Sequence, residues 1–412
     1  MAHRILFVSD RYPPYYTGGY EVACQTIVDA LRRRGWKTLV VTSTFGVSRP
    51  RRDGHVMRIL HRPEDATTLL GLGGGEIADT VALRTIVRLW RPDAVYVWCV
   101  RQLHASVHGC LRDSGVPIVF NIADAWLPGH FADARQRREL WTVNGSRGPR
   151  ALLKRAGIAV AKTCVPTFTR ELTVGDVGAP YIISCSKFRE DQHLRLRLPA
   201  RDPVVIYNGV DMSRFHGSPD RFADLRLLFA GRLVPEKGVH TIVPALASLA
   251  ARGIPARLTI AGVKVFPWRY SDELKALVAR HGLEDRVSFL DAVPPAEMVD
   301  VYRRHNVLLF PSTIAEGLPM SVLEAMACGL LVVGTTVGGT AELLEDAVTG
   351  IAVPPEDPAA LGEALADIVR NPARARSLAA EGQARVRATA DLNVIADRTE
   401  AYVDRMIASS ND

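Results

Sequence analysis

Apolar and polar residues follow two different rhythms along this chain. Short apolar runs rich in β-branched residues occur at 4–9, 38–43 and 94–99, and between them lie stretches such as 22–35 and 78–90 in which apolar residues recur every three or four positions. The short runs predict buried strands, and the longer stretches predict amphipathic helices. Because strands and helices alternate, we expect parallel sheets covered by helices on both faces.

The same alternation restarts in the second half of the chain. Its predicted strands lie at 225–231, 256–262, 287–290, 307–311 and 330–335. The segment that separates the halves contains prolines and a turn-forming Asn208-Gly209 pair, so we place a linker near residues 198–204. We therefore predict an α/β fold of two Rossmann-like, doubly wound domains, residues 1–200 and 201–385, that face each other across a cleft.

Two further segments refine this picture. After residue 357 the pattern is wholly helical, and we expect residues 386–412 to form a helix that packs back on the first domain. The stretch GLGGGE at 71–76 resembles a dinucleotide-binding fingerprint, but Glu76 stands where the third glycine belongs, and polar residues rather than the first strand precede it. We interpret this stretch as a flexible loop.

Composition and charge narrow the class of protein. The net charge of +7 is modest for 412 residues and the Lys and Arg residues are dispersed, so an anionic small molecule or an acidic membrane surface is expected as a partner rather than nucleic acid. The sequence has no signal-peptide core and no run near the roughly 20 apolar residues of a membrane span. Its six cysteines include no C-x-x-C pair, which indicates thiols in a reducing compartment. We expect a cytoplasmic protein.

The segment EGLPMSVLEAMACG at 316–329 carries two carboxylates, Glu316 and Glu324, eight residues apart. Pro319 suits the first turn of a helix and Gly329 suits its end, so Glu316 should precede the helix and Glu324 should lie in its second turn. The start of a helix binds phosphate, and carboxylates accept hydrogen bonds from hydroxyls. A nucleotide sugar has hydroxyls on both sides of its diphosphate. The alternative is a solvated helix face, which the apolar surroundings of Glu324 disfavour.

A diphosphate also needs cations and close backbone contacts. Arg232 and Lys237, in GRLVPEKG at 231–238, should lie at the carboxyl end of a strand, where Arg suits bidentate phosphate contact and Lys supplies a compact charge. An ordinary surface loop with two cations is the alternative. Gly18 and Gly19, between the first strand and the first helix, could direct backbone N–H groups at the phosphates. The glycines of GGTAE at 338–342 would allow close approach of the backbone to a ligand.

Together these motifs, with YNGVDMSRF after the linker, resemble the retaining glycosyltransferases of family 4, the glycosyl transferases group 1, which have the GT-B fold. The resemblance implies transfer of a sugar from a nucleotide-diphosphate donor, with UDP among the expected nucleotides, to a hydroxyl of a small-molecule, saccharide or lipid acceptor. It also implies retention of the anomeric configuration and no need for a metal or other cofactor, and no D-x-D motif occurs in the chain. The sequence leaves the base, the sugar, the acceptor and the oligomeric state open.

The resemblance also assigns roles to residues of this chain. Glu316 would hold hydroxyls of the donor sugar, with Arg232 and Lys237 neutralising the diphosphate as it leaves, and these three residues are the predicted catalytic residues. No protein nucleophile is expected, because the family is described as using a same-face displacement in which the leaving phosphate helps to deprotonate the acceptor. Glu324 would hold the ribose. The predicted donor-binding residues are Gly18, Gly19, Gly317, Leu318, Pro319, Met320, Ser321 and Glu324.

The chain departs from the family at two positions. Relatives carry His-Asp after the strand that corresponds to 117–122, and here Ala123 precedes Asp124. This departure suggests a modified donor sugar, such as a deoxy sugar or a pentose. Asn121 and Asp124 are candidate contacts to the sugar or the acceptor, although Asp124 could equally cap a helix. Asp291 stands where relatives commonly have glycine, which leaves the base-binding loop open.

The acceptor should meet the first domain, where residues 129–155 mix many basic side chains with Trp141. A solvated helical face is the alternative for this region. A nucleotide-sugar 2-epimerase and a non-catalytic nucleotide-sugar-binding protein remain alternative functions, and we expect the two domains to close over the donor.

Overall fold

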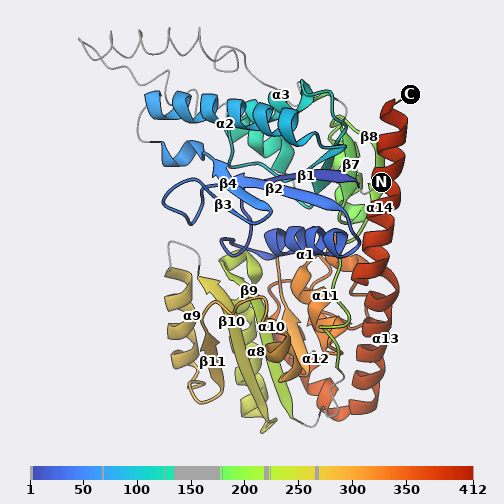
Figure 1. Ribbon diagram of the computed structural model, residues 1–412. Coiled ribbons are helices and arrows are strands. Elements are labelled where there is room, and N and C mark those ends of the chain that lie inside the picture. The colour runs from blue at the N-terminus through green and yellow to red at the C-terminus, as the bar shows by residue number, and fades with distance from the viewer. Residues whose placement is uncertain are drawn as a thin grey trace, which may run out of the picture.

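Two α/β domains, one above the other, make up the chain, and the last helices run along one side of both (Figure 1). This arrangement comes from a computed structural model. It describes residues 3–66, 69–124, 126–133, 177–178, 180–217, 222, 224–264 and 269–411. The α/β class and the two doubly wound domains inferred from the sequence are confirmed.

The first domain is built on an eight-stranded sheet with the order β3-β4-β2-β1-β5-β6-β7-β8. Neighbouring strands are parallel except for the β3–β4 pair. Its strands are β1 (Arg4–Ser9), β2 (Lys37–Ser43), β3 (Arg51–Asp53), β4 (Val56–Leu60), β5 (Ala94–Cys99), β6 (Ile118–Ile122), β7 (Tyr181–Ser184) and β8 (Arg201–Val205). The strand order reverses at β1, so a crevice forms beyond the carboxyl ends of β1 and β5, where ligands bind in such sheets.

The second domain is built on a six-stranded parallel sheet with the order β11-β10-β9-β12-β13-β14. Its strands are β9 (Leu225–Leu233), β10 (Ala256–Lys264), β11 (Val287–Leu290), β12 (Val307–Phe310), β13 (Leu331–Gly334) and β14 (Ile351–Ala352). The strand order reverses between β9 and β12, which creates a second crevice facing the first.

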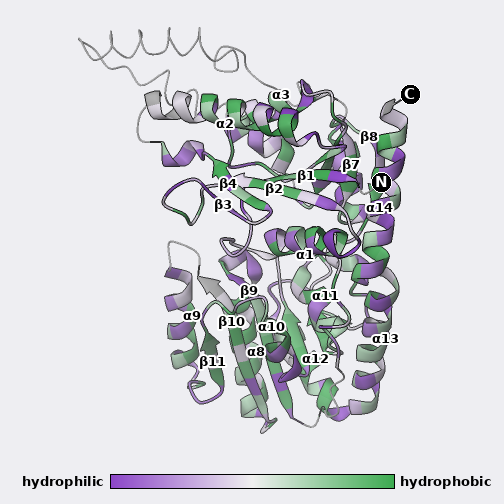
Figure 2. Cartoon of the chain, in the orientation of Figure 1, coloured by the Kyte–Doolittle hydropathy of each residue, from purple (hydrophilic) through white to green (hydrophobic). Residues whose placement is uncertain are grey.

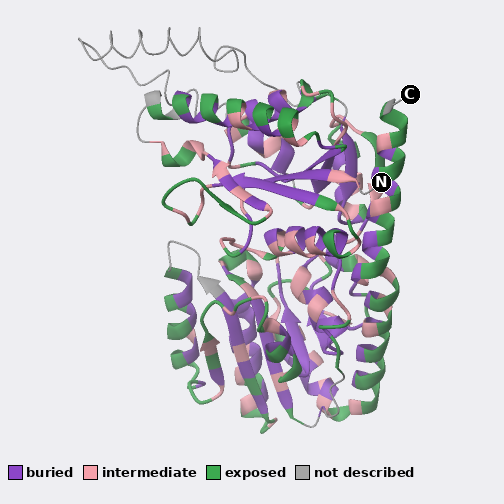
Figure 3. Cartoon of the chain, in the orientation of Figure 1, coloured by how far each residue is buried: buried purple, intermediate pink, exposed green. Residues whose placement is uncertain are grey.

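Helices cover both sheets and leave the central strands buried, whereas the edge strands β3 and β8 are largely exposed (Figures 2 and 3). The helices of the first domain are α1 (Gly19–Arg33), α2 (Leu69–Trp90), α3 (Ser106–Arg112) and α7 (Lys187–Arg195). Those that follow are α8 (Val239–Ala251), α9 (Arg269–Arg280), α10 (Met298–Arg303), α11 (Met320–Ala327), α12 (Pro358–Arg370), α13 (Pro372–Ala390) and α14 (Leu392–Asn411). The described residues also form the short 3-10 helices η1 (Pro63–Asp65), η3 (Pro235–Lys237) and η4 (Gly339–Glu342). No helix of these described residues is long and apolar enough to span a membrane.

The chain crosses between the domains twice, and the two crossings lie side by side. Val210 donates its N–H to the carbonyl of Ala390 (2.9 Å), and Leu392 donates its N–H to the carbonyl of Val210 (3.0 Å). Beyond the second crossing, α14 packs on α1, where Arg34 pairs with Asp397 and Glu400. The predicted return of the last helix to the first domain is therefore confirmed.

The linker expected near residues 198–204 is wrong by several residues. Strand β8 occupies much of this stretch and pairs with β7 in the first sheet, so the chain leaves that sheet after Val205. Pro203 was interpreted as a sign of the linker, but β8 is the edge strand of the sheet, and an edge strand tolerates proline.

The flexible loop expected at GLGGGE is also wrong, because this stretch lies inside α2. A Cβ on Gly75 would lie 3.1 Å from the Cβ of His61, so the glycine lets the helix pack closely. One turn further on, buried Asp79 accepts hydrogen bonds from the backbone N–H of His61 (2.9 Å) and contacts its Nδ1 (2.7 Å). Tertiary packing therefore outweighs the low helix propensity of glycine, which costs about 1 kcal/mol per residue.

Candidate active site

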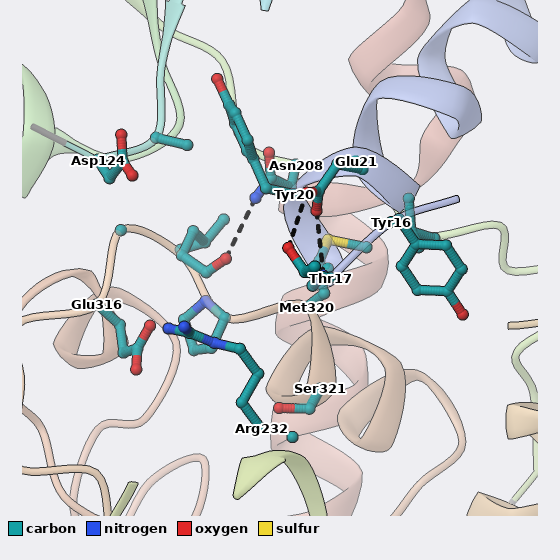
Figure 4. Close-up of a pocket in the computed structure, with 18 of the residues that line it drawn as sticks. Tyr16, Thr17, Tyr20, Glu21, Asp124, Asn208, Arg232, Glu316, Met320 and Ser321 are labelled. Atoms are coloured by element: carbon teal, nitrogen blue, oxygen red, sulfur yellow. Dashed lines mark hydrogen bonds between the residues drawn. The ribbon is translucent and has the colours of Figure 1, made fainter. Parts of the chain in front are cut away.

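A cleft of about 540 Å³ lies between the two domains, at the carboxyl ends of both sets of strands. The segments that follow β1, β5 and β6 line it from the first domain, and those at the ends of β9, β10 and β12 line it from the second. The predicted residues that line it are Gly18, Gly19, Asp124, Arg232, Lys237, Glu316, Gly317, Leu318, Pro319, Met320, Ser321 and Glu324. Residues far apart in the sequence are thus brought together (Figure 4).

Helix α11 starts at the cleft for reasons visible in its sequence. Pro319 is the N-cap residue and has an extended backbone, so the helix begins at Met320. Gly329 has a positive φ of 79°, which suits the end of the helix. Gly317 lies directly against the first domain, since a Cβ there would collide with the carbonyl oxygen of Ala123. The loop before α11 therefore needs glycine at this contact between domains.

Lys237 and Glu316 form an ion pair at the floor of the cleft. Their side chains are only 12% and 17% exposed, and Glu316 also accepts a hydrogen bond from the hydroxyl of Ser312 (3.0 Å). Lys237 ends η3, and Gly238 follows with a positive φ of 68°, a position where a Cβ would collide with the carbonyl oxygen of Pro311. The predicted anion-binding cation and the predicted hydroxyl-binding acid therefore form one unit.

Arg232 lies at the carboxyl end of β9 and is exposed to the cleft. Figure 4 shows its guanidinium group reaching toward Glu316. Two cations, Arg232 and Lys237, therefore face the region between the start of α11 and the first domain, as the sequence pattern predicts. This arrangement suits a bound diphosphate.

Glu324 lies one turn into α11 and accepts a hydrogen bond from the hydroxyl of Tyr302 (2.8 Å). Burial raises the pKa of Glu324 to about 7, although the hydrogen bond from Tyr302 lowers it. Sequence reasoning missed Tyr302 because α10 gives no motif, and the contact depends on the packing of α10 beside α11. The pair leaves one carboxylate of the cleft ready to accept hydroxyl hydrogen bonds.

The Gly-Gly loop approaches the cleft from the first domain in an unexpected way. Gly18 donates a backbone hydrogen bond to the carboxylate of Glu21 (3.2 Å). The hydroxyl of Thr17 donates a second hydrogen bond to the same carboxylate (3.2 Å). Thr17 in turn accepts a hydrogen bond from Arg11 (2.5 Å). Glu21 therefore holds the N–H of Gly18 in this arrangement, and donation of that N–H to a phosphate stays a prediction. Gly19 instead lies against Met320 at the start of α11.

Of the two candidate contacts to the sugar or the acceptor, Asp124 lines the cleft and Asn121 does not. Asp124 lines the cleft and accepts a hydrogen bond from the N–H of Trp126 (2.9 Å), so it caps the following turn, as the alternative interpretation held. Burial raises the pKa of Asp124, while nearby Arg189 and other arginines lower it. Asn121 does not line the cleft, because its amide contacts the hydroxyls of Tyr96 and Tyr20 inside the first domain. A contact from Asn121 to a ligand is thus not supported.

The cleft also contains residues that the sequence reasoning did not single out. Asp10 and Arg11 follow β1 directly, so their position at a strand's carboxyl end was a signal that could have revealed them. Burial, followed by the charge of Glu21, raises the pKa of Asp10 to about 7. Arg189, on α7, donates to the carbonyl of Ala315 (2.6 Å), a contact that no sequence pattern indicates.

Of the predicted acceptor region 129–155, residues 134–155 lie outside the described residues. Val293 and Pro295, which follow Asp291 in the sequence, line the cleft. Among the residues the structure describes, no group of three or more His, Cys, Asp or Glu side chains could hold a metal ion.

Comparisons with known proteins agree with this geometry. Residues 220–385 match the sequence model of the family described as glycosyl transferases group 1. The glycogen synthase of Mycobacterium tuberculosis is 28% identical over 424 residues, which cover 96% of this chain and 93% of that protein. The D-inositol 3-phosphate glycosyltransferase of Frankia alni is 34% identical over 183 residues, or 41% of this chain and 44% of that protein.

Solved structures share the fold over nearly the whole chain. Sucrose-phosphate synthase from Thermosynechococcus elongatus matches with a TM-score of 0.73 and 20% identity, covering 99% of this chain and 100% of that one. HepE from Anabaena, in complex with UDP, matches with a TM-score of 0.68 and 20% identity, covering 98% of this chain and 100% of that one. At these identities the likeness establishes the fold.

Proposed function

We propose that this chain, whose residues 220–385 match the model of the glycosyl transferases group 1, transfers a sugar from a UDP sugar to an acceptor hydroxyl with retention of configuration. It is a transferase, as its named relatives are. The observation that carries the proposal is the Lys237–Glu316 pair beside Arg232, at the start of α11 and inside the cleft between the domains.

The cleft offers a complementary group for each part of a nucleotide sugar. Glu324, held by Tyr302, would accept hydroxyls of the ribose. The diphosphate would lie over the start of α11, where backbone N–H groups and a partial positive charge favour anions, with Arg232 and Lys237 beside it. Glu316 would accept hydroxyls of the sugar. The UDP bound in the related fold of HepE supports UDP as the nucleotide.

In the proposed reaction the bond between the anomeric carbon and the diphosphate oxygen breaks while the acceptor oxygen attacks from the same face. Negative charge grows on the leaving oxygen, and preorganised cations that face it lower the barrier. Arg232 and Lys237 supply this charge, so the proposal needs no metal. The acceptor's proton passes to the leaving diphosphate. Glu316 contributes by fixing the sugar and by holding Lys237 in place.

Donor binding is the first test, and it needs no knowledge of the acceptor. Thermal unfolding should be followed with UDP, with UDP-, GDP- and ADP-linked hexoses, and with UDP-linked pentose and deoxy sugars. A donor bound at 100 times its Kd raises the free energy of unfolding by about 2.7 kcal/mol. A shift with UDP sugars supports the proposal, and no shift with any nucleotide sugar would contradict it. The strongest shift with pentose or deoxy donors would support a modified donor sugar.

Removing a cation should then separate catalysis from folding. Lys237→Ala should lower the release of UDP from the best donor by about 10²–10³-fold, the range seen when one charge-stabilising group is removed from an active site. Lys275→Ala is the matched control, because Lys275 is an exposed lysine on α9. Equal rates for Lys237→Ala and the wild type would overturn the assigned role. Recovery of a donor altered at carbon 2 would instead indicate an epimerase.

A further inference from the structure

The N-terminus of α7, a helix of the first domain, is capped by an acid of the second domain. Glu342, in η4, accepts hydrogen bonds from the backbone N–H groups of Lys187 (3.0 Å) and Phe188 (2.9 Å). These N–H groups belong to the first turn, which has no partners within its own helix, and a carboxylate is favoured at the positive end of a helix. The hydroxyl of Tyr207, in the crossing segment, donates to the same carboxylate (3.0 Å).

A second contact runs from α7 to the loop that carries Glu316. Arg189 is buried at 7% exposure, and its Nη2 donates to the carbonyl of Ala315 (2.6 Å), the residue before Glu316. Its Nη1 is held by the side chain of Gln192, one turn along α7 (2.6 Å). The guanidinium is therefore fixed by the first domain while it holds a backbone group of the second.

The two loops of the second domain that touch α7 are also joined to each other. Gly339 donates its N–H to the carbonyl of Glu316 (2.9 Å), so η4 and the Glu316 loop are hydrogen-bonded. A Cβ on Gly339 would collide with the carbonyl oxygen of Gly317 and come within 3.0 Å of the hydroxyl of Ser186, which precedes α7. Hydrogen bonds and close contacts of side chains and backbone therefore connect the start of α7 to Glu316.

We propose that Glu342 is a positioning residue, which with Arg189 fixes the Glu316 loop against α7 and thereby sets Glu316 and Lys237 in their working arrangement when the domains are closed. This inference rests on the proposed function. Glu342 is not among the residues that line the cleft, so its effect on the reaction passes through the contacts with α7. Loss of the acid should separate the domains and slow turnover while leaving the nucleotide contacts of α11 in place.

The test compares Glu342→Ala with Glu345→Ala. Glu345 is three residues further on and pairs with Arg385 (2.6 Å) within the C-terminal half, so its removal takes away an acid without touching α7. Small-angle scattering of the unliganded proteins should give a larger radius of gyration for Glu342→Ala than for the wild type and Glu345→Ala. The rate of UDP release at saturation, from the UDP sugar that gives the largest thermal shift, should fall at least tenfold for Glu342→Ala alone. The Kd for UDP should stay within about threefold of the wild type for both variants.

Each outcome decides the inference. A wild-type radius and a wild-type kcat for Glu342→Ala would overturn it, and so would equal losses of kcat and UDP affinity, which indicate a general structural defect. Should Glu342→Ala fail to fold, Glu342→Gln replaces it. The glutamine side chain has one carbonyl oxygen in place of two carboxylate oxygens, so it can accept a hydrogen bond from only one of the two N–H groups at each moment, and its kcat should be intermediate. If the wild type binds neither UDP nor any of the UDP sugars, the proposed function fails, whereas the scattering comparison still decides whether Glu342 holds the domains together.

Discussion

At the scale of single residues, the protonation of Glu324 links the cleft to stability. Burial raises the pKa of this carboxyl from 4.5 to about 7, so between these values the folded protein holds a proton that the unfolded chain has released. The free energy of unfolding should therefore fall as the pH rises from about 4.5 to 7, by on the order of 1–3 kcal/mol from this group.

Glu324→Gln tests this dependence, because an amide keeps an acceptor for the hydroxyl of Tyr302 and cannot ionise. Urea unfolding should give similar stabilities for the variant and the wild type at pH 5, with the variant more stable at pH 8. A variant that is less stable than the wild type at pH 8 would show that the charged form of Glu324 is favoured in the folded protein.

Single residues also show where sequence reasoning succeeds and where it stops. The positions of Arg232, Glu316 and Glu324 follow from local rules, since strands end and helices begin at recognisable prolines and glycines. The contacts of Tyr302 and Glu342 could not be predicted in the same way, because their partners lie 22 and more than 100 residues away in the sequence. Asn121 does not line the cleft, and its contacts with Tyr96 and Tyr20 join residues that are also distant in the sequence.

At the scale of secondary-structure elements, α14 holds the first domain through one buried tyrosine. The hydroxyl of Tyr402 accepts a hydrogen bond from the N–H of Ile182 (3.2 Å) and donates to the carbonyl of Asp202 (2.5 Å), so it joins β7, β8 and α14. Removing a partner from buried backbone groups costs about 1–3 kcal/mol. Tyr402→Phe should therefore lower the free energy of unfolding by about that amount.

Urea unfolding measures this loss, with Val394→Ala on the same helix as the control. Val394 is 38% exposed, and such surface substitutions usually change stability by no more than about 0.5 kcal/mol. A Tyr402→Phe variant as stable as the control would mean that α14 is held by its apolar contacts and ion pairs alone.

Elements with strong local patterns could be predicted from the sequence, and marginal ones could not. The apolar runs of β1, β5 and β12 are buried strands, as predicted. Strands β7 and β8 and helix α7 were not predicted, because β7 has only four residues, β8 carries a proline and α7 is mostly polar. Their identity depends on pairing with the sheet and with the second domain, which local sequence does not encode.

At the scale of the whole molecule, the two domains meet where α1 faces α11. Gly19 begins α1, and a Cβ there would lie 3.1 Å from the Cβ of Met320. A leucine at this position cannot fit without moving the helices apart, so Gly19→Leu should increase the radius of gyration measured by small-angle scattering. Gly19→Leu should also admit water to the cleft, from which domain closure would exclude it, and should lower turnover.

Gly18→Ala serves as the control, since a Cβ on Gly18 has no atom nearer than 3.7 Å in its surroundings. Its radius of gyration should equal that of the wild type. If Gly19→Leu also keeps the wild-type radius, the contact between α1 and α11 does not determine how close the domains are in solution.

The architecture of two facing domains and the return of the last helix could be predicted from the sequence, because both follow from the order of elements. The separation of the domains could not, since it depends on bare glycines such as Gly19 and Gly317 meeting side chains and carbonyls across the cleft. From the local sequence alone, such glycines are interpreted only as turn residues.

The side-by-side crossings at Val210 and Asp391 also bear on how the protein is made. The second domain is in effect an insertion within the first, so a ribosome completes it before α14, with its 20 residues, has emerged. During that interval the apolar flank around Tyr181 and Ile183, which α14 covers in the finished protein, is open to water. Until α14 is made, the nascent chain thus exposes an apolar surface that α14 later covers.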